Sequence, residues 1–284
     1  MKKNLLNWKN KHSENHELNS PKISVIMPVY NTKQWVWEAI ESILDQSFWD
    51  FEFIIVDDCS TDWSYEICKE YAEKDKRIKL YRNEKNRWVA FTKNRLISLT
   101  STNYITSQDS DDISCVDRLK LEYLFLEENK DYSVVSWNNI IIDEEWKVIW
   151  YRKYSNNIRN IILKKTPVSH PTTMMRKSDF LSVWGYSDVK YIEDYSLWIK
   201  FYNKWYKIKN LDKYLLYYRL RQWAQKSNIK WTIRGTLKCQ KNAYSLIKPS
   251  FSDLFYHFML YCLLLLPNNM IIEIFKWIEF RTKK

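Results

Sequence analysis

The order of apolar runs in residues 21–112 constrains this chain more than any other feature of its sequence. Four short runs have the length of buried strands and lie at 23–27, 53–56, 78–81 and 104–106. Three intervening segments repeat apolar residues at helical spacing, at 34–45, 64–74 and 89–100. This alternation predicts an α/β fold with a mostly parallel central sheet flanked by helices. We expect the first strand to stop at Pro28, because proline cannot donate to a strand ladder.

The second half continues this pattern less regularly. We expect helices at 116–128 and 194–202. Strands at 140–142 and 148–149 should form a hairpin through a turn at 144–147. A last strand is expected at the edge of the sheet, at 214–218.

Composition and charge narrow the range of functions. The 284 residues carry a formal net charge of +11, which favours anionic partners such as nucleotide phosphates or acidic lipid. The five cysteines are scattered without a CxxC pair, which argues against a disulfide framework or zinc site and fits a reducing cytosol. Residues 1–20 are polar and are expected to form a flexible leader, and they lack the apolar block of a secretory signal. The basic residues are dispersed and no recognition motif is present, so we expect no nucleic-acid partner.

Glycine is nearly absent, although turns normally depend on it. The chain has two glycines and fifteen tryptophans, whereas roughly 20 glycines are expected at average usage. Several tryptophans occupy turn positions, where a bulky ring resists the positive φ that glycine adopts freely. We hypothesise that UGA codons which the host reads as glycine have been translated as tryptophan; the alternative is a genuinely tryptophan-rich protein. The candidates, expected to be exposed in loops, are Trp49, Trp63, Trp88, Trp146, Trp184, Trp205 and Trp223. Trp198 lies in a helical apolar pattern and is expected to be genuine.

Polar clusters follow three of the predicted strands. They lie at 28–31, 57–62 and 109–112. Because ligands bind beyond the carboxyl ends of parallel strands, all three on one edge predict a site. Asp109 and Asp111 are two residues apart, so on extended backbone their carboxylates point the same way. Such a pair suits Mg²⁺ or Mn²⁺ held together with substrate phosphates, although Asp-rich loops also cap helices.

These motifs resemble the inverting glycosyltransferases of family 2. The similarity covers about residues 21–220, in the expected order and spacing, and includes Glu193-Asp194-Tyr195 with Leu197-Trp198 behind them. It implies a GT-A fold, a nucleotide-sugar donor and a divalent cation. It also divides the chain into a catalytic domain at 21–220, with a nucleotide-binding half at 21–112 and an acceptor half at 113–220, and C-terminal helices at 221–284. Trp88 and Trp184 stand where the family usually has glycine, in RGVA and GGY.

The same resemblance implies roles for individual residues. Asp58 would accept from the uracil N–H, with Pro28 and Tyr30 forming the nucleoside pocket. Asp109 and Asp111 would be the DxD pair, Asp109 toward the nucleotide and Asp111 as the more direct metal ligand. Asp194 matches the catalytic base, although as the opening residue of a helix it also suits an N-cap. His170, Arg176 and Glu193 lie in stretches that line the acceptor or diphosphate side, and for His170 a satisfied loop histidine weighs equally.

We therefore expect a metal-dependent inverting glycosyltransferase. It would move a hexose or N-acetylhexosamine from a UDP-sugar to a saccharide or lipid-linked acceptor, in surface polysaccharide synthesis. The main rival is a catalytically degenerate, transferase-like binding module at the membrane, against which the retained acids argue. A nucleotidyltransferase would need a Gly- and Lys-rich triphosphate loop that residues 28–33 do not offer.

The tail beyond residue 250 has a different character. The segment 254–266 is almost wholly apolar, Pro267 interrupts it, and an amphipathic segment at 270–280 ends in basic residues. Thirteen apolar residues are too few to span a bilayer. They suit an interfacial pair of helices on anionic lipid or, equally, helices packed on the catalytic domain. The expected location is the cytoplasm, with peripheral contact at the inner face of the cell membrane.

Overall fold

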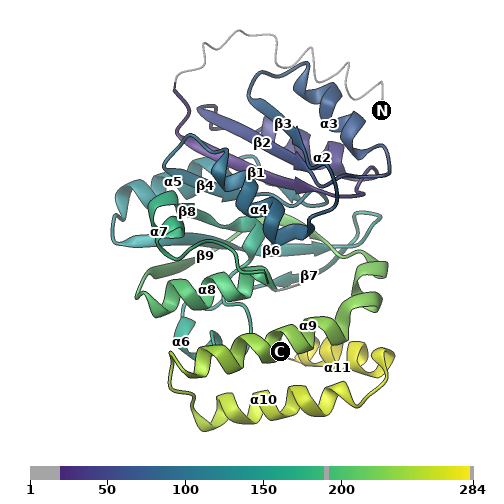
Figure 1. The fold of residues 1–284 in the computed structure, drawn as a ribbon, viewed down its shortest axis with the longest axis vertical. Helices are drawn as coiled ribbons and strands as arrows, with labels where there is room; N and C mark the ends of the chain where they lie inside the picture. Colours follow the sequence, from purple (N-terminus) through teal and green to yellow (C-terminus); the bar gives the residue numbers. More distant parts are fainter. Residues whose placement is uncertain (1–19, 189–191, 282–284) are drawn as a thin grey trace.

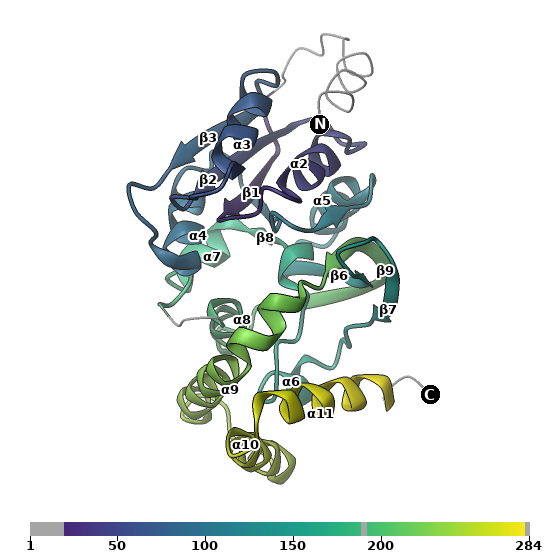
Figure 2. The same ribbon diagram turned by 90° about the vertical axis from the view of Figure 1, so that its right-hand side faces the viewer.

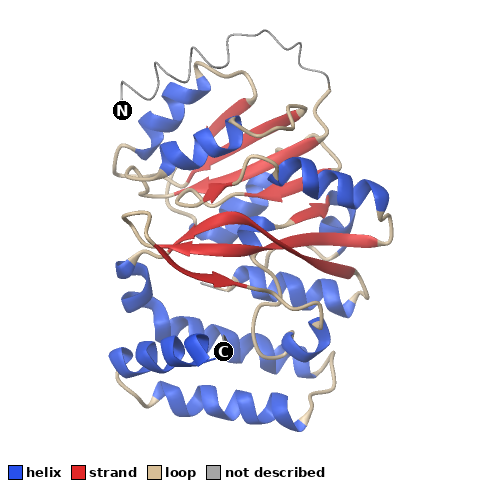
Figure 3. Ribbon diagram, turned by 180° about the vertical axis from the view of Figure 1, so that it is seen from behind, coloured by secondary structure: helices blue, strands red, loops and turns tan. Residues whose placement is uncertain are grey.

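The computed structural model describes residues 20–188 and 192–281. The predicted leader at 1–20 lies almost wholly outside these residues. The described chain forms one mixed sheet in the order β3-β2-β1-β4-β8-β6-β9-β5, with β7 paired to β6. Helices cover the sheet, and the C-terminal helices stack at the end of the molecule opposite the N-terminal strands (Figures 1 and 3).

The N-terminal half has the predicted strand–helix alternation. Its elements are β1 (Ile23–Val29), α2 (Val36–Leu44), β2 (Phe51–Asp57), α3 (Ser64–Ala72), β3 (Ile78–Arg82), α4 (Trp88–Ser98) and β4 (Tyr104–Ser107). The four strands are parallel, with β1 between β2 and β4. Every residue of β2 is buried, because helices cover both faces of the sheet here. The two hydrophobic clusters divide alternate strand residues between them: Ile54 belongs to one and Phe53 and Ile55 to the other.

The first strand does not stop at Pro28, so that expectation is wrong. β1 continues to Val29, and Pro28 is paired with Val56 of β2. The carbonyl of Ile26 faces β4, where it accepts from the amide of Gln108. Pro28, two residues on, turns its nitrogen to the same side, beyond the last residue pair of β1 and β4. No ladder hydrogen bond is lost, which is why proline is tolerated there.

The second half adds antiparallel strands. Its elements are β5 (Ile113–Ser114), α5 (Arg118–Glu128), β6 (Tyr132–Ile142), β7 (Val148–Arg152), α6 (Ile158–Ile161), the 3₁₀ turn η1 (His170–Thr172), β8 (Met174–Arg176), α7 (Lys177–Ser182), α8 (Glu193–Asn203) and β9 (Lys207–Arg219). The short β8 joins the two halves, antiparallel to both β4 and β6. The predicted hairpin is confirmed as β6–β7. The expected edge strand is instead the last part of β9, which lies between β6 and β5.

Three helices complete the chain: α9 (Gln222–Tyr244), α10 (Phe251–Leu264) and α11 (Asn268–Arg281). They share a small apolar cluster of Ile233, Leu237, Leu260, Leu263 and Ile271. α9 also packs against α8, so the tail rests on the sheet domain through this helix (Figure 2). Over residues 20–188 and 192–281, none of the helices has the length and apolar character needed to cross a membrane.

Four candidate tryptophans have a left-handed backbone, and the six whose side chains the structure describes are exposed in loops, in turns or, for Trp88, at the first residue of α4. Trp88, Trp146, Trp184 and Trp205 have φ of 65°, 69°, 62° and 61°. The exposed fraction of these side chains lies between 38% at Trp49 and 91% at Trp184, with 69% at Trp63. Trp223 is the second residue of α9, so the expectation of a loop is wrong for it, and its side chain lies outside the described part of the chain. Trp198 is fully buried in the core, as its helical apolar pattern predicts.

Candidate functional site

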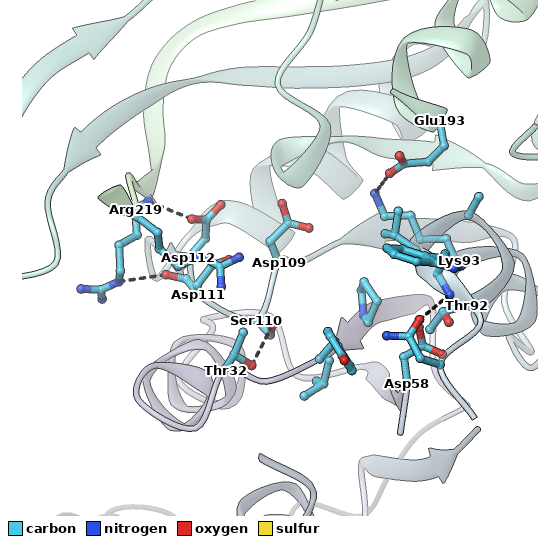
Figure 4. A pocket seen from close by; sticks show the side chains of 18 of the residues that line it. Thr32, Asp58, Thr92, Lys93, Asp109, Ser110, Asp111, Asp112, Glu193 and Arg219 are labelled. Atoms are coloured by element: carbon cyan, nitrogen blue, oxygen red, sulfur yellow. Dashed lines mark hydrogen bonds and ion pairs between the residues drawn. The ribbon is translucent and has the colours of Figure 1, made fainter. Parts of the chain in front are cut away.

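A cavity of about 660 Å³ opens at the carboxyl ends of the parallel strands. All three predicted polar clusters contribute to its lining. Figure 4 shows Asp109 in its middle, between the Asp111–Arg219 side and the pair formed by Lys93 and Glu193. Of the residues singled out from the sequence, the lining includes Pro28, Tyr30, Asp58, Asp109, Asp111 and Glu193.

The loops after β1 and β2 are held together by their own polar side chains. The amide of Asn31 donates to Ser60 Oγ over 3.1 Å, and the Asn31 carbonyl oxygen Oδ1 accepts from the amide of Thr61 at 2.9 Å. Thr32 Oγ1 donates to Ser110 Oγ in the loop after β4, at 3.1 Å. These polar residues therefore do more than end the strands: they fix three loops relative to one another around the cavity.

Asp58 is buried at the end of β2, and its Oδ1 is held by two donors. Asn83 Nδ2 lies 2.6 Å away and the amide of Arg87 lies 2.9 Å away. These bonds come from the segment between β3 and α4, so they fix the orientation of the carboxylate. Tyr30 lies across the same cavity with 45% of its surface exposed.

Asp109 and Asp111 follow β4 in a crowded acidic segment. Burial raises the pKa of Asp109 to about 6; Lys93 opposes the shift, and the carboxylates of Asp111 and Glu193 add to it. Burial together with Asp111 and Asp109 raises the pKa of Asp112 well above its usual value. Asp112 Oδ1 accepts from the backbone amide of Arg219 at 2.9 Å. Negative charge is thus concentrated at the centre of the cavity.

Lys93, which sequence reasoning missed, supplies a buried counter-charge. Its Nζ lies 2.8 Å from Glu193 Oε1, and both side chains are less than a tenth exposed. Burial works to lower the pKa of Lys93, but the carboxylates of Glu193 and Asp109 outweigh it and hold the pKa above its usual value. The only sequence signal was a lysine on the inward side of the helix that follows the third strand.

Asp194 lies in the first turn of α8, next to Glu193. Its Oδ1 accepts from the amide of the next residue, Tyr195, at 2.7 Å. It is not the N-cap that its position also suited, because α8 begins at Glu193 after Ile192 and has no side-chain cap hydrogen bond. Burial and then the Glu193 carboxylate raise its pKa to about 6, against the opposing charge of Lys93. Asp194 is outside the immediate lining of the cavity, but its charge interacts with Asp109 within it.

Arg219 and Arg221, also missed, close the other side of the cavity. Arg219 Nη2 lies 2.7 Å from Glu38 Oε2, and its Nε donates to the backbone carbonyl of Asp111 at 3.0 Å. Arg221 Nε lies 2.7 Å from Asp111 Oδ2. Arg219 is the last residue of β9 and Arg221 precedes α9; for this part of the chain the sequence predicted only an edge strand.

His170 lies behind the cavity and not in its lining. It is buried, with Nε2 at 3.2 Å from the Tyr186 hydroxyl and 3.4 Å from Ser107 Oγ. Burial and the charge of Lys93 hold its pKa well below the usual value, so the ring is neutral. Its ring also lies 5.6 Å from that of Trp198, between centroids. Both polar contacts use Nε2, whereas Nδ1 is buried without a hydrogen-bond partner, so the ring is only partly satisfied.

The structure does not bring Arg176 to the cavity. Arg176 is paired with Tyr104, at the amino end of β4 and so at the opposite edge of the sheet. Its guanidinium donates to the Tyr104 hydroxyl at 2.9 Å and to the carbonyls of Tyr132 and Leu126 at 2.9 and 2.6 Å. Because β8 runs antiparallel to β4, its last residue lies far from the strand ends that carry the acids. Arg176 therefore ties strands together.

The carboxylates of Asp109 and Asp111 fit a divalent cation that is shared with substrate phosphates. Both are hard oxygen donors, and a cation would offset the burial, and the smaller repulsion from Asp111 and Glu193, that raise the pKa of Asp109. Over residues 20–188 and 192–281, His, Cys, Asp and Glu side chains form no group of three or more suited to a metal ion. The remaining ligands would be phosphate oxygens and water, as is usual for Mg²⁺.

Acids gathered beyond the carboxyl ends of the parallel strands β1, β2 and β4 form the kind of ligand site that open α/β sheets carry. The chain belongs to glycosyl transferase family 2, whose model matches residues 24–184. It is 35% identical to the O-antigen biosynthesis glycosyltransferase WbnJ of Escherichia coli, over 70% of this chain and 79% of that protein. It is 32% identical to an uncharacterized glycosyltransferase of Methanocaldococcus jannaschii, over 94% and 96% of the two chains.

Solved structures share the fold at lower identity. S. aureus TarS in complex with UDP-GlcNAc has a TM-score of 0.64 and 22% identity, over 84% of this chain and 73% of that one. The mannosyltransferase PcManGT from Pyrobaculum calidifontis, in complex with GDP-Man and Mn²⁺, has a TM-score of 0.65 and 16% identity, over 95% and 79%. The GT-A fold is thereby established, and with the family it makes the protein a glycosyltransferase.

Proposed function

We propose that this protein is a metal-dependent inverting glycosyltransferase that moves a sugar from a UDP-sugar to a saccharide or lipid-linked acceptor. The observation that carries the proposal is the convergence of Asp58, Asp109 and Asp111 on one cavity, with Glu193 lining it and Asp194 beside it. A hexose or N-acetylhexosamine is the proposed sugar, and a surface polysaccharide the proposed product. The E. coli relative named for O-antigen biosynthesis supports that setting.

The donor nucleoside would bind at the β1 and β2 end of the cavity. Asp58 is held by Asn83 and Arg87 through one oxygen, which leaves the other to accept from a uracil N–H. Tyr30 and Pro28 line the same side and offer an apolar surface for the base. UDP-GlcNAc bound to TarS supports a uridine donor, whereas GDP-Man in PcManGT is the alternative that a donor screen must include.

Asp109 and Asp111 would hold Mg²⁺ or Mn²⁺, with Asp111 the more direct ligand. The bound cation would neutralise charge that develops on the departing diphosphate. Lys93 and Arg219 add fixed positive charge on either side of Asp109 (Figure 4). These groups already stand in place, so little reorganisation is needed as the leaving group gains charge.

Asp194 would act as the catalytic base. In an inverting transfer, the acceptor hydroxyl attacks the anomeric carbon from the side opposite the leaving diphosphate, and a carboxylate takes its proton. A base works best when its pKa lies near the working pH, and burial and Glu193 raise the pKa of Asp194 to about 6. Lys93 would position Glu193 through their ion pair. Its positive charge also limits the rise in the pKa of Asp194.

The test is a donor screen that measures release of the nucleoside diphosphate with Mn²⁺, Mg²⁺ or EDTA. We expect turnover of UDP-sugars that EDTA abolishes and that Asp111→Ala and Asp194→Asn reduce by at least ~10²-fold. The matched control is Asp131→Asn, an exposed carboxylate in a surface ion pair with Lys207. Full turnover in Asp194→Asn would remove that residue as the base. Tight nucleotide binding without turnover of any donor would favour the degenerate binding module.

We also propose that α10 contacts an anionic membrane, on its cytoplasmic side. The helix packs on α9 and α11 through Leu260 and Leu263. Its other side exposes an apolar stripe of Leu254, Phe255, Phe258, Tyr261 and Leu265. Spacing of three and four residues places these side chains together on one face. The net charge of +11 and the basic residues at the end of the sequence favour acidic lipid as the partner.

Sedimentation with vesicles of phosphatidylglycerol and phosphatidylcholine tests this contact. Phe258→Glu should reduce binding, since it places a charge in the middle of the stripe. Leu181→Glu, at an exposed position on α7, is the control. Equal binding of both variants and the parent would remove α10 as the membrane contact.

We further propose that Trp88, Trp146, Trp184 and Trp205 stand for glycines. Few non-glycine residues have positive φ, and those are mostly Asn, Asp or His. Trp205 follows α8 at a C-terminal turn in which its amide bonds to Tyr202 O and that of Tyr206 to Phe201 O. This is the Schellman pattern, whose left-handed residue is usually glycine.

The same pattern recurs at Trp184. Its amide bonds to Leu181 O, and that of Gly185 to Phe180 O, at the end of α7. Trp146 takes the left-handed position of the β6–β7 hairpin, where its amide bonds to Asp143 O. Sequencing the gene tests the proposal directly: UGA codons at these positions support it, and UGG codons would refute it.

A further inference from the structure

Arg221 already occupies the carboxylate that the proposed function gives to the cation. Its Nε lies 2.7 Å from Asp111 Oδ2, and the side chains of Arg221 and Asp111 are 31% and 14% exposed. The guanidinium also faces the ring of Trp35, 5.5 Å from its centroid. Arg221 lies between the end of β9 and the start of α9, at the rim of the cavity.

Arg219, two residues earlier, makes a useful contrast. Its side chain is completely buried and tied to Glu38 and to the backbone of Asp111. Arg219 is therefore a fixed part of the wall. Arg221 holds Asp111 through a side-chain ion pair at a partly exposed position, which costs far less to break.

A divalent cation that binds Asp111 through Oδ2 would compete with the guanidinium for that oxygen. A Mg²⁺ ion lies about 2.1 Å from each oxygen that binds it. A guanidinium hydrogen-bonded to the same oxygen would therefore lie directly beside a second positive charge. Repulsion between the two positive charges on one carboxylate then favours displacement of Arg221 when a lone cation binds. Once displaced at the rim, its planar fork suits the diphosphate that arrives with the cation.

We propose that Arg221 is a displaceable counter-ion, which holds Asp111 while the cavity is empty and pairs with the donor diphosphate once a cation has taken that carboxylate. This inference rests on the proposed function. It makes two predictions of opposite sign for one substitution. Loss of Arg221 should strengthen binding of the cation alone and weaken binding of the nucleotide in the presence of the cation.

The experiment uses the full chain and measures binding without turnover. Free Mn²⁺ is followed by electron paramagnetic resonance, and UDP binding by calorimetry at saturating Mn²⁺. In Arg221→Gln we expect Mn²⁺ affinity to rise about fivefold and UDP affinity to fall about fivefold, the scale of one partly exposed ion pair. Arg221→Lys keeps the charge and should change both less. Arg234→Gln, at an exposed position on α9, is the matched control and should change neither.

The two readouts separate this inference from the proposed function. If the parent protein binds Mn²⁺ and UDP but Arg221→Gln leaves Mn²⁺ affinity unchanged or lower, the counter-ion role is wrong and the transferase proposal stands. If the parent binds neither ligand, both fail. A thermal melt of each variant shows whether it is folded. A misfolded variant would lose Mn²⁺ affinity, so misfolding cannot account for the expected rise.

Discussion

Replacement of the four left-handed tryptophans by glycine should stabilise the protein. A left-handed non-glycine residue costs about 1–2 kcal/mol. Part of this gain in stability is lost again, because ordering a glycine costs about 0.5–1 kcal/mol more in conformational entropy than ordering another residue. The net gain is therefore about 0.5–1 kcal/mol a site. Trp88, Trp146, Trp184 and Trp205 lie in four separate turns, so the gains should add to about 2–4 kcal/mol.

The assay is thermal unfolding of the parent and of the quadruple variant, each made from a synthetic gene. At about 2–4 °C per kcal/mol for a large domain, we expect Tm to rise by about 5–15 °C. Little burial is lost, because these rings are about half exposed or more, from 46% at Trp146 to 91% at Trp184.

Two single variants control for the substitution itself. Trp63 has φ of −79°, so Trp63→Gly removes no strain and should leave Tm nearly unchanged. Trp198 is fully buried, so Trp198→Gly should cost at least ~3–5 kcal/mol through the cavity it leaves. A quadruple variant that melts at or below the parent temperature would refute the argument from backbone strain.

The remaining predictions concern the site and the tail. Burial and Glu193 raise the pKa of Asp194 to about 6, and the base must be ionised to act. A plot of log kcat against pH should therefore rise with slope one below about pH 6 and level off above it. A flat profile from pH 5 to 8 would contradict this. Lys93→Met should shift that inflection to higher pH, because the charge of Lys93 opposes the rise in the pKa of Asp194. The same substitution leaves Glu193 buried without its partner, so urea unfolding should show a loss of about 3–5 kcal/mol in stability. Asp111→Ala should abolish the Mn²⁺-dependent part of UDP binding in calorimetry, whereas Mn²⁺ dependence that survives would move the cation elsewhere. Phe258→Glu should lower vesicle binding without changing Tm, since its side chain is 64% exposed.

The sequence predicted the N-terminal half well because strands buried on both faces read as continuous apolar runs. The polar clusters were located correctly because parallel strands bring their carboxyl ends to one edge of the sheet. Pro28 was misread because its effect depends on which neighbour its nitrogen faces. That information lies in the register of β1 with β4 and not in the order of residues.

The parts that could not be predicted depend on contacts between distant segments. Lys93 and Glu193 are far apart in sequence, so their ion pair leaves no local pattern. Arg219 was missed because β9 was expected at an edge, whereas it lies between β6 and β5. Arg176 was expected near the site, but the antiparallel course of β8 carries it to the other edge. In each case topology, and not residue type, decides where the side chain lies.

The helix α9 has a mechanical consequence of its own. It begins one residue after Arg221 and continues for 23 residues, and it is bent: a short first part leaves the rim of the cavity and a longer second part lies alongside α10 (Figure 1). Figure 2 shows it running from the sheet toward α10. Because the helix is continuous through this bend, it ties the mouth of the cavity to the far helices by a connection of fixed length. Any surface on which α10 rests would then hold that mouth at a set height, and an acceptor attached to the surface would have to be long enough to reach it.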